Sequence, residues 1–102
     1  MSEFRTVGPA NDISHGDMKA FDVGGVKIAV ANVAGTLYAF GDTCTHRQCP
    51  LAKGELEDTT VTCPCHGSQF DVTTGGVFTG PAEDPVGSYP VRVEDDTIQI
   101  EV

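Results

Sequence analysis

The chain has 102 residues, of which 39% are apolar and 21% are charged, so it is long enough for one domain and too apolar to be disordered. Acidic residues outnumber basic ones by 15 to 6, for a formal net charge of −9, which argues against nucleic-acid binding because phosphates would repel the chain. The same charge suits either a protein that docks on basic partner surfaces or one that is simply very soluble.

The N-terminus lacks the basic start and apolar core of a secretory signal. No stretch of the sequence reaches the roughly 20 apolar residues that a membrane-spanning helix needs. We therefore expect a cytoplasmic protein without a membrane anchor, although a chain trimmed of a leader would look the same.

Most of the chain alternates between apolar and polar residues in the manner of β-strands. In chain order, strands are predicted at 4–7, 19–23, 26–33, 36–40, 60–63, 69–72, 89–93 and 97–102. Residues 11–17 form a polar loop with room for a short turn of helix. This pattern predicts an all-β domain.

Three segments carry turn signals between these strands. Gly24-Gly25 separates two β-rich runs and predicts a hairpin with a primed turn, whose central residues need positive φ. Residues 32–35 and 94–96 predict two further turns. From about 42 to 83 the chain is instead rich in Cys, His, Gly and Pro, and a long, turn-rich insert of this kind is more often functional than idle.

All four cysteines and two of the three histidines lie inside this insert. Cys44 and His46 form a C-x-H pair, and Cys63 and His66 form a C-x-x-H pair. Common zinc sites place Cys with Cys and His with His, so two mixed pairs favour a binuclear iron centre. In such a centre one iron takes both thiolates and the other both imidazoles. A Cys₂His₂ zinc site remains the alternative at this point.

The insert resembles the cluster-binding part of the Rieske [2Fe–2S] family. Residues 44–49 (CTHRQC) and 63–68 (CPCHGS) resemble its two cluster loops, and residues 80–82 (GPA) resemble the proline-containing loop that covers the cluster. The flanking strands resemble the family's antiparallel base. The resemblance implies one Rieske domain over 1–102, with a base sandwich and an inserted cluster-binding subdomain at about 42–83.

The same resemblance implies one Rieske-type [2Fe–2S] cluster as the cofactor. Cys44 and Cys63 would bind the inner iron, and His46 and His66 the outer iron near the surface. Replacing two thiolates by neutral imidazoles makes reduction easier, which moves the potential from about −400 mV into a range of about −150 to +300 mV.

Cys49 and Cys65 match positions that form a disulfide between the two cluster loops in the respiratory branch of the family. The resemblance therefore implies a Cys49–Cys65 bond, which would contribute about 3 kcal/mol by closing a loop of this length. Because disulfides are uncommon in the cytosol, two buried free thiols are the alternative.

Three further residues are expected to tune the potential. Ser68 matches a serine that donates a hydrogen bond to a bridging sulfide, and such bonds raise the potential. Phe70 stands where high-potential members have a tyrosine, so one bond is missing. Pro81 belongs to the covering loop. An intermediate potential follows, unless Ser68 only stabilises a turn and Phe70 only packs in the core.

By resemblance, the chain is a soluble Rieske-type ferredoxin: a monomeric one-electron carrier and not itself an enzyme. It would take electrons from an NAD(P)H-dependent reductase and pass them to a terminal oxygenase or another redox enzyme. One alternative is the small electron-transfer subunit of a larger redox enzyme, such as a nitrite-reductase-type or oxidase complex. The other is a zinc-binding interaction module.

Overall fold

The computed structural model describes residues 4–43, 49–65, 67–80 and 85–101. Over these residues the chain is built of short β-strands with two single-turn 3₁₀ helices, as the strand patterning predicted. In order, the elements are β1 (Phe4–Pro9), η1 (Ala10–Asp12), β2 (Met18–Val23), β3 (Val26–Val33), β4 (Thr36–Gly41), η2 (Leu51–Lys53), β5 (Glu55–Glu57), β6 (Thr60–Thr62), β7 (Gln69–Asp71), β8 (Val77–Thr79), β9 (Ser88–Tyr89), β10 (Val91–Glu94) and β11 (Thr97–Glu101). Within the described ranges, no helix is both long enough and apolar enough to cross a membrane.

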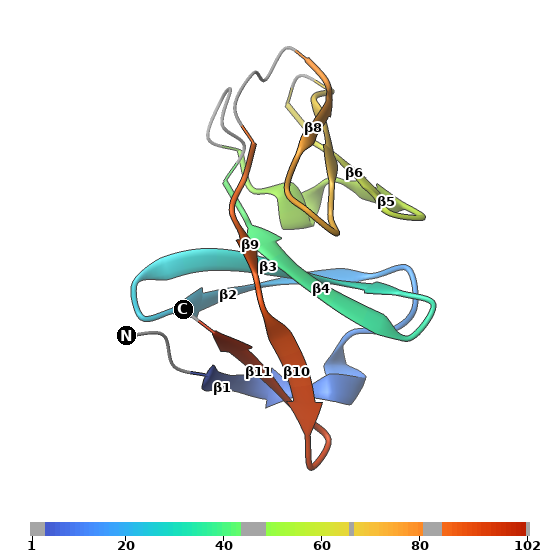
Figure 1. Cartoon of the computed structure of the whole chain (residues 1–102). Helices are drawn as coiled ribbons and strands as arrows, with labels where there is room; N and C mark the ends of the chain where they lie inside the picture. Colours follow the sequence, from blue (N-terminus) through green and yellow to red (C-terminus); the bar gives the residue numbers. More distant parts are fainter. Residues whose placement is uncertain (1–3, 44–48, 66, 81–84, 102) are drawn as a thin grey trace.

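The strands form three antiparallel sheets. Two of them, with the orders β1-β11-β10 and β2-β3-β4-β9, make up the base in the lower half of Figure 1. The third, with the order β5-β6-β7-β8, stands above the base and is called the upper sheet here. The predicted all-β architecture is therefore confirmed, with the turn-rich insert folded as a small sheet of its own.

Strand β3 separates two hydrophobic cores. Ile28 and Val30 face the core inside the base, and Ala29 and Ala31 face the core under the upper sheet; all four side chains are fully buried. Successive strand residues point to opposite faces, so a strand covered on both faces must be apolar at every position. That requirement explains the unbroken apolar run from Ile28 to Ala31.

The hairpin turns explain how the base strands keep their register. Gly24 and Gly25 have φ values of 61° and 87°, and Val23 pairs with Val26, which is the predicted two-residue primed turn. Near the C-terminus, the turn is shorter than predicted: it consists of Asp95-Asp96 alone, both with positive φ. Residue 94 instead extends β10 and pairs with residue 97 of β11.

The strand predicted at 89–93 is divided into two strands that belong to different sheets. Tyr89 pairs with Ala39 of β4, whereas Val91 pairs with Ile100 of β11. Pro90 lies between them and has no N–H to donate to a ladder, although its carbonyl accepts a hydrogen bond from Glu101 N. The prediction was wrong here because the proline marks the place where the chain crosses between sheets.

Candidate metal centre

The ends of the first cysteine–histidine loop are held together by Asp42. Its carboxylate Oδ1 accepts a hydrogen bond of 2.9 Å from the Ala52 amide, and its carbonyl accepts one of 2.6 Å from the Leu51 amide. Thr43 and Pro50 form an antiparallel bridge beside these bonds. The start and the end of the loop are therefore fixed to each other, with Leu51 fully buried in the core below.

The sequence pattern gives no sign of this role of Asp42, a residue that is only 3% exposed. An aspartate two residues after a predicted strand is usually a solvated turn residue, and no local pattern distinguishes a buried aspartate from a solvated one. The distinguishing contact comes from η2, ten positions further along the chain. Only the folded structure brings the two together.

Cys63 lies directly after β6, and its side chain is 2% exposed. Its amide donates a 2.8 Å hydrogen bond to the Ser68 carbonyl, and its own carbonyl accepts one of 3.2 Å from the Gly67 amide. Gly67 has a φ of 76°, which favours glycine. These bonds close a tight turn that fixes the Cys63 sulfur at the base of the second loop.

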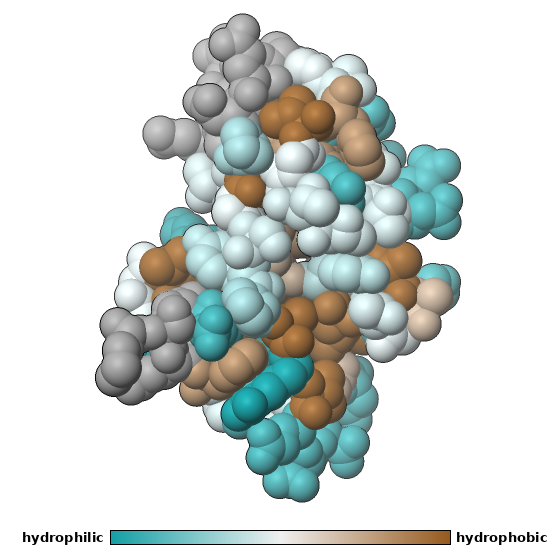
Figure 2. Space-filling model, in the orientation of Figure 1, coloured by the Kyte–Doolittle hydropathy of each residue, from teal (hydrophilic) through white to brown (hydrophobic). Residues whose placement is uncertain are grey.

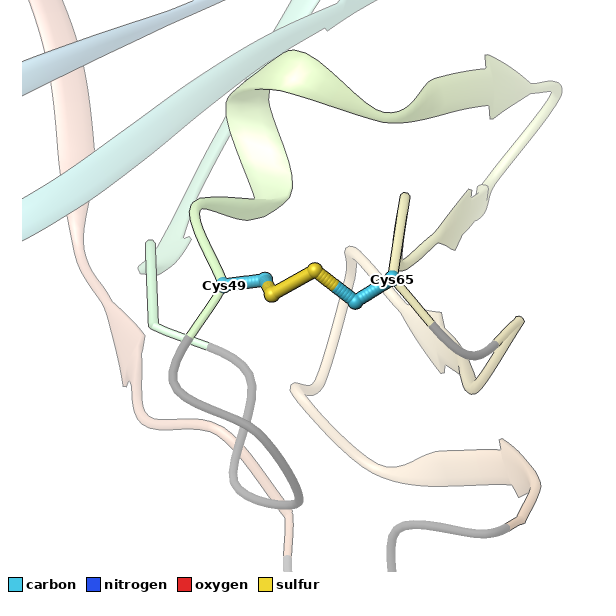
Figure 3. The surroundings of a disulfide bond; sticks show 2 residues. All are labelled: Cys49 and Cys65. Carbon is cyan, nitrogen blue, oxygen red and sulfur yellow. A yellow bond between two sulfur atoms is a disulfide. The ribbon is translucent and has the colours of Figure 1, made fainter.

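A disulfide joins the two loops, as the resemblance implied. Cys49 precedes η2 and Cys65 follows β6, and their side chains point toward each other in Figure 3. Their Cα atoms are 6.4 Å apart, within the usual span of a disulfide. The Sγ atoms of Cys49, Cys63 and Cys65 all lie within 4.8 Å of one another.

Ser68 and Phe70 are both fully buried. Phe70 belongs to the core under the upper sheet and pairs with Val61 of β6, so its ring does pack in the core. The other predicted site residues lie outside the described residues: Cys44, His46, His66 and Pro81. The structure therefore shows the two loops joined by the disulfide, and of the four predicted ligands it describes Cys63.

Comparison with known proteins decides the family. Residues 3–90 match the family model for the Rieske [2Fe-2S] domain. The chain belongs to the Rieske [2Fe–2S] family. A curated relative from Escherichia coli K12, the 3-phenylpropionate/cinnamic acid dioxygenase ferredoxin subunit, is 40% identical over 92% of this chain and 89% of its own length.

Two solved structures are similar to this Rieske chain. One is a ferredoxin bound to its reduced oxygenase in carbazole 1,9a-dioxygenase, with a TM-score of 0.88 and 33% identity over 95% of this chain and 91% of the other. The other is the putative NADH-dependent nitrite reductase small subunit of Mycobacterium tuberculosis, with a TM-score of 0.89 and coverage of 100% and 96%. At 19% identity the second likeness shows the fold alone.

The cofactor of this Rieske domain is one [2Fe–2S] cluster, and the donors in the structure fit it. A buried thiol at the end of a strand, fixed by two backbone hydrogen bonds, suits a sulfur ligand to the inner iron. The disulfide beside it holds the opposite loop at a short distance. The family assignment thus favours an iron–sulfur cluster over the zinc site.

Proposed function

We propose that this protein is the ferredoxin component of an oxygenase system, carrying one electron at a time from a reductase to a terminal oxygenase. The observation that carries the proposal is the 40% identity to a dioxygenase ferredoxin subunit over nearly the full length of both chains. A match of that extent leaves no room in the relative for a catalytic domain. The protein is therefore a carrier, and its specificity lies in the partners it contacts.

For the cluster we propose the ligands Cys44, His46, Cys63 and His66. The cluster would supply a one-electron couple, with the histidine-bound iron closer to the surface. The protein's own contribution is rigidity: the turn after β6 fixes Cys63, and Asp42 fixes the ends of the first loop. Holding the loops still limits the rearrangement that accompanies a change of charge at the metal.

We further propose that Ser68, Phe70 and Pro81 set an intermediate potential. Ser68 is fully buried beside the turn that carries Cys63, which is a suitable place for a hydroxyl that donates to a cluster sulfur. Phe70 is buried two positions further on and brings no hydroxyl. The expected potential is therefore below that of members with both donors.

For partner docking we propose the outer face of β8. Phe78 on this strand is 55% exposed, and the strand leads directly into residues 80–82, which resemble the covering loop. In Figure 2, brown atoms lie over the upper part of the molecule where Figure 1 draws β8. Aromatic residues, phenylalanine included, are enriched at protein–protein interfaces relative to the rest of the surface, so Phe78 is suited to contact the oxygenase.

We also propose that residues 1–102 form one domain with a cluster-binding subdomain at about 42–83, and that the protein is a cytoplasmic monomer. A second candidate is the small subunit of a nitrite-reductase-type enzyme. The disulfide favours it, because the resemblance places that bond in the respiratory branch and not in simple ferredoxins. Stable co-purification with a large subunit would support this candidate over a free carrier.

The test begins with anaerobic reconstitution of the full chain. Iron and acid-labile sulfide in equal amounts, and a paramagnetic signal after dithionite reduction, are expected. The reduced protein, freed of dithionite, is then mixed with the oxygenase of the E. coli 3-phenylpropionate dioxygenase. Oxidation of the carrier at a rate that depends on its concentration supports the proposal; a zinc-bound chain without sulfide refutes it.

A further inference from the structure

Three cysteine sulfur atoms lie close together in the described part of the chain, although a disulfide involves only two. The Sγ atoms of Cys49, Cys63 and Cys65 are all within 4.8 Å of one another. Cys49 and Cys65 are bonded, and Cys63 carries a free thiol. Cys63 is buried while Cys65 is exposed, so the free thiol of Cys63 lies on the buried side of the disulfide.

A thiolate cleaves a disulfide when it can approach one of the two sulfur atoms, and it forms a new disulfide in the same step. Holding the attacking sulfur beside its target raises the rate greatly, because no encounter has to occur first. Cys63 is held in this way by the two backbone hydrogen bonds of its turn. Thiol–disulfide exchange within the chain therefore starts from a sulfur that already lies within 4.8 Å of both sulfur atoms of the disulfide.

We propose that, when the cluster is absent, Cys63 exchanges with the Cys49–Cys65 disulfide. The Cys63 thiol gives up its proton, its sulfur attacks Cys49 Sγ, and the Cys49–Cys63 bond forms. The Cys49–Cys65 bond breaks, and the Cys65 sulfur keeps the electron pair and takes up a proton. One thiol and one disulfide are present before and after, so no external oxidant or reductant is needed.

Attack at Cys49 is favoured over attack at Cys65. A Cys63–Cys65 bond would have to span a single residue, Pro64, whose ring restricts the backbone. A Cys49–Cys63 bond joins the same two segments that the structure already holds face to face, one before η2 and one after β6. The exchanged form thus keeps the crosslink and changes only which cysteine of the second loop is free.

This inference rests on the proposed role of Cys63 as a cluster ligand. In the exchanged form Cys63 has no thiolate to offer, and in the loaded form its sulfur is no longer available as a nucleophile. The exchanged disulfide and the bound cluster therefore exclude each other. The chain without its cluster would divide between a form ready for loading and a form that must first exchange back.

The experiment maps disulfides in the full chain with and without its cluster. Free thiols are blocked with N-ethylmaleimide at low pH, and the protein is digested with trypsin without reduction. Cleavage after Arg47, Lys53 and Arg92 places Cys49 in peptide 48–53, and Cys63 and Cys65 together in peptide 54–92. Fragmentation at Pro64 then shows which of those two cysteines carries the maleimide.

In the chelator-stripped protein, we expect peptides 48–53 and 54–92 to be crosslinked, with maleimide on Cys65. In the loaded protein the same two peptides should be crosslinked through Cys65. Maleimide should then be on Cys63 alone or absent from peptide 54–92. Cys44→Ser, analysed without its cluster, removes the fourth cysteine and should still show the exchange. Cys63→Ser removes the nucleophile and should leave Cys65 unmodified.

Maleimide on Cys63 alone in the stripped Cys44→Ser chain overturns the proposal. So does exchange that occurs only in guanidinium, because the folded geometry would then contribute nothing. The iron and sulfide content of the loaded protein is measured separately. A chain that binds no cluster yet still exchanges would refute the proposed function and not the exchange.

Discussion

The Asp42 carboxylate and the Ala52 amide are joined by a 2.9 Å hydrogen bond across the loop between β4 and η2. Asp42 is almost completely buried. The first cysteine–histidine loop is thus closed by a partly buried polar contact and not by apolar packing alone. Such contacts are costly to break, because the remaining partner is left partly buried without its hydrogen bond.

Replacing this carboxylate should loosen the first cluster loop. Asp42→Ala leaves the Ala52 amide without its acceptor and should lower the free energy of unfolding by about 1–3 kcal/mol, measured in guanidinium. Asp42→Asn keeps an acceptor oxygen at the same place and should lose less. Equal losses in the two variants would show that the negative charge, and not the hydrogen bond to Ala52, is the important feature.

Replacing a histidine ligand by cysteine should lower the potential. His66→Cys puts a negative thiolate where the resemblance places a neutral imidazole, so the added electron is less stable, and the midpoint should fall by roughly 100 mV or more. His15→Ala is the control: His15 lies outside both cysteine–histidine loops, and its Nδ1 accepts a hydrogen bond from the Ala34 amide. Potentiometry that finds both midpoints unchanged would contradict the ligand assignment.

Removing the Ser68 hydroxyl should lower the midpoint by a smaller amount. One neutral hydrogen bond is worth about 1 kcal/mol, which corresponds to about 40 mV for a one-electron couple. Ser88→Ala, at an exposed position of strand β9, provides the matched control. If Ser68→Ala lowers the melting temperature and leaves the midpoint where it was, the hydroxyl stabilises the turn and does not tune the cluster.

Two glycines with nearly the same φ should respond very differently to alanine. Gly75 (φ 81°) lies against the Val86 carbonyl, which a Cβ would strike, whereas Gly16 (φ 85°) has open space around it. Gly16→Ala should cost about 1–2 kcal/mol for the left-handed backbone alone. Gly75→Ala should cost clearly more, and it should also disturb the turn between β7 and β8. Similar denaturation midpoints for the two variants would be evidence against this close approach.

The exposed aromatic on β8 should matter for the partner and not for the fold. Phe78→Ser should leave the melting temperature unchanged and slow the oxidation of reduced carrier by the E. coli oxygenase by about tenfold, or about 1.4 kcal/mol. Val93→Ser is the control, because Val93 is 49% exposed on β10 of the base. Stopped-flow traces in which both variants slow equally would place the docking surface elsewhere.

The base of the fold was largely predictable from the sequence. The hairpin at Gly24-Gly25 has a local chemical signal, and the apolar run of β3 fixes a strand that is covered on both faces. The upper sheet was only half predicted: its central strands β6 and β7 were expected and its edge strands β5 and β8 were not, although all four have three residues. An edge strand of three residues has little pattern of its own and forms because its single neighbour pairs with it.

The type of cofactor was predictable from the sequence, whereas the contacts that fix the two loops were not. The spacing of the cysteine–histidine pairs is a local feature of the chain, and so the family could be recognised from it. The contact between Asp42 and Ala52, and the closeness of the Cys63 sulfur to the disulfide, depend on how β4, η2 and β6 pack. No pattern within any one of these segments carries that information.

Strand β3 contributes alternate side chains to the core of the base and to the core beneath the upper sheet. Because the two cores share this strand, unfolding of one core would expose apolar side chains of the other. The base and the upper sheet should therefore unfold as one cooperative unit. Heating should therefore release iron and unfold the base in a single transition. The carrier is therefore expected to exist either fully folded with its cluster or fully unfolded without it.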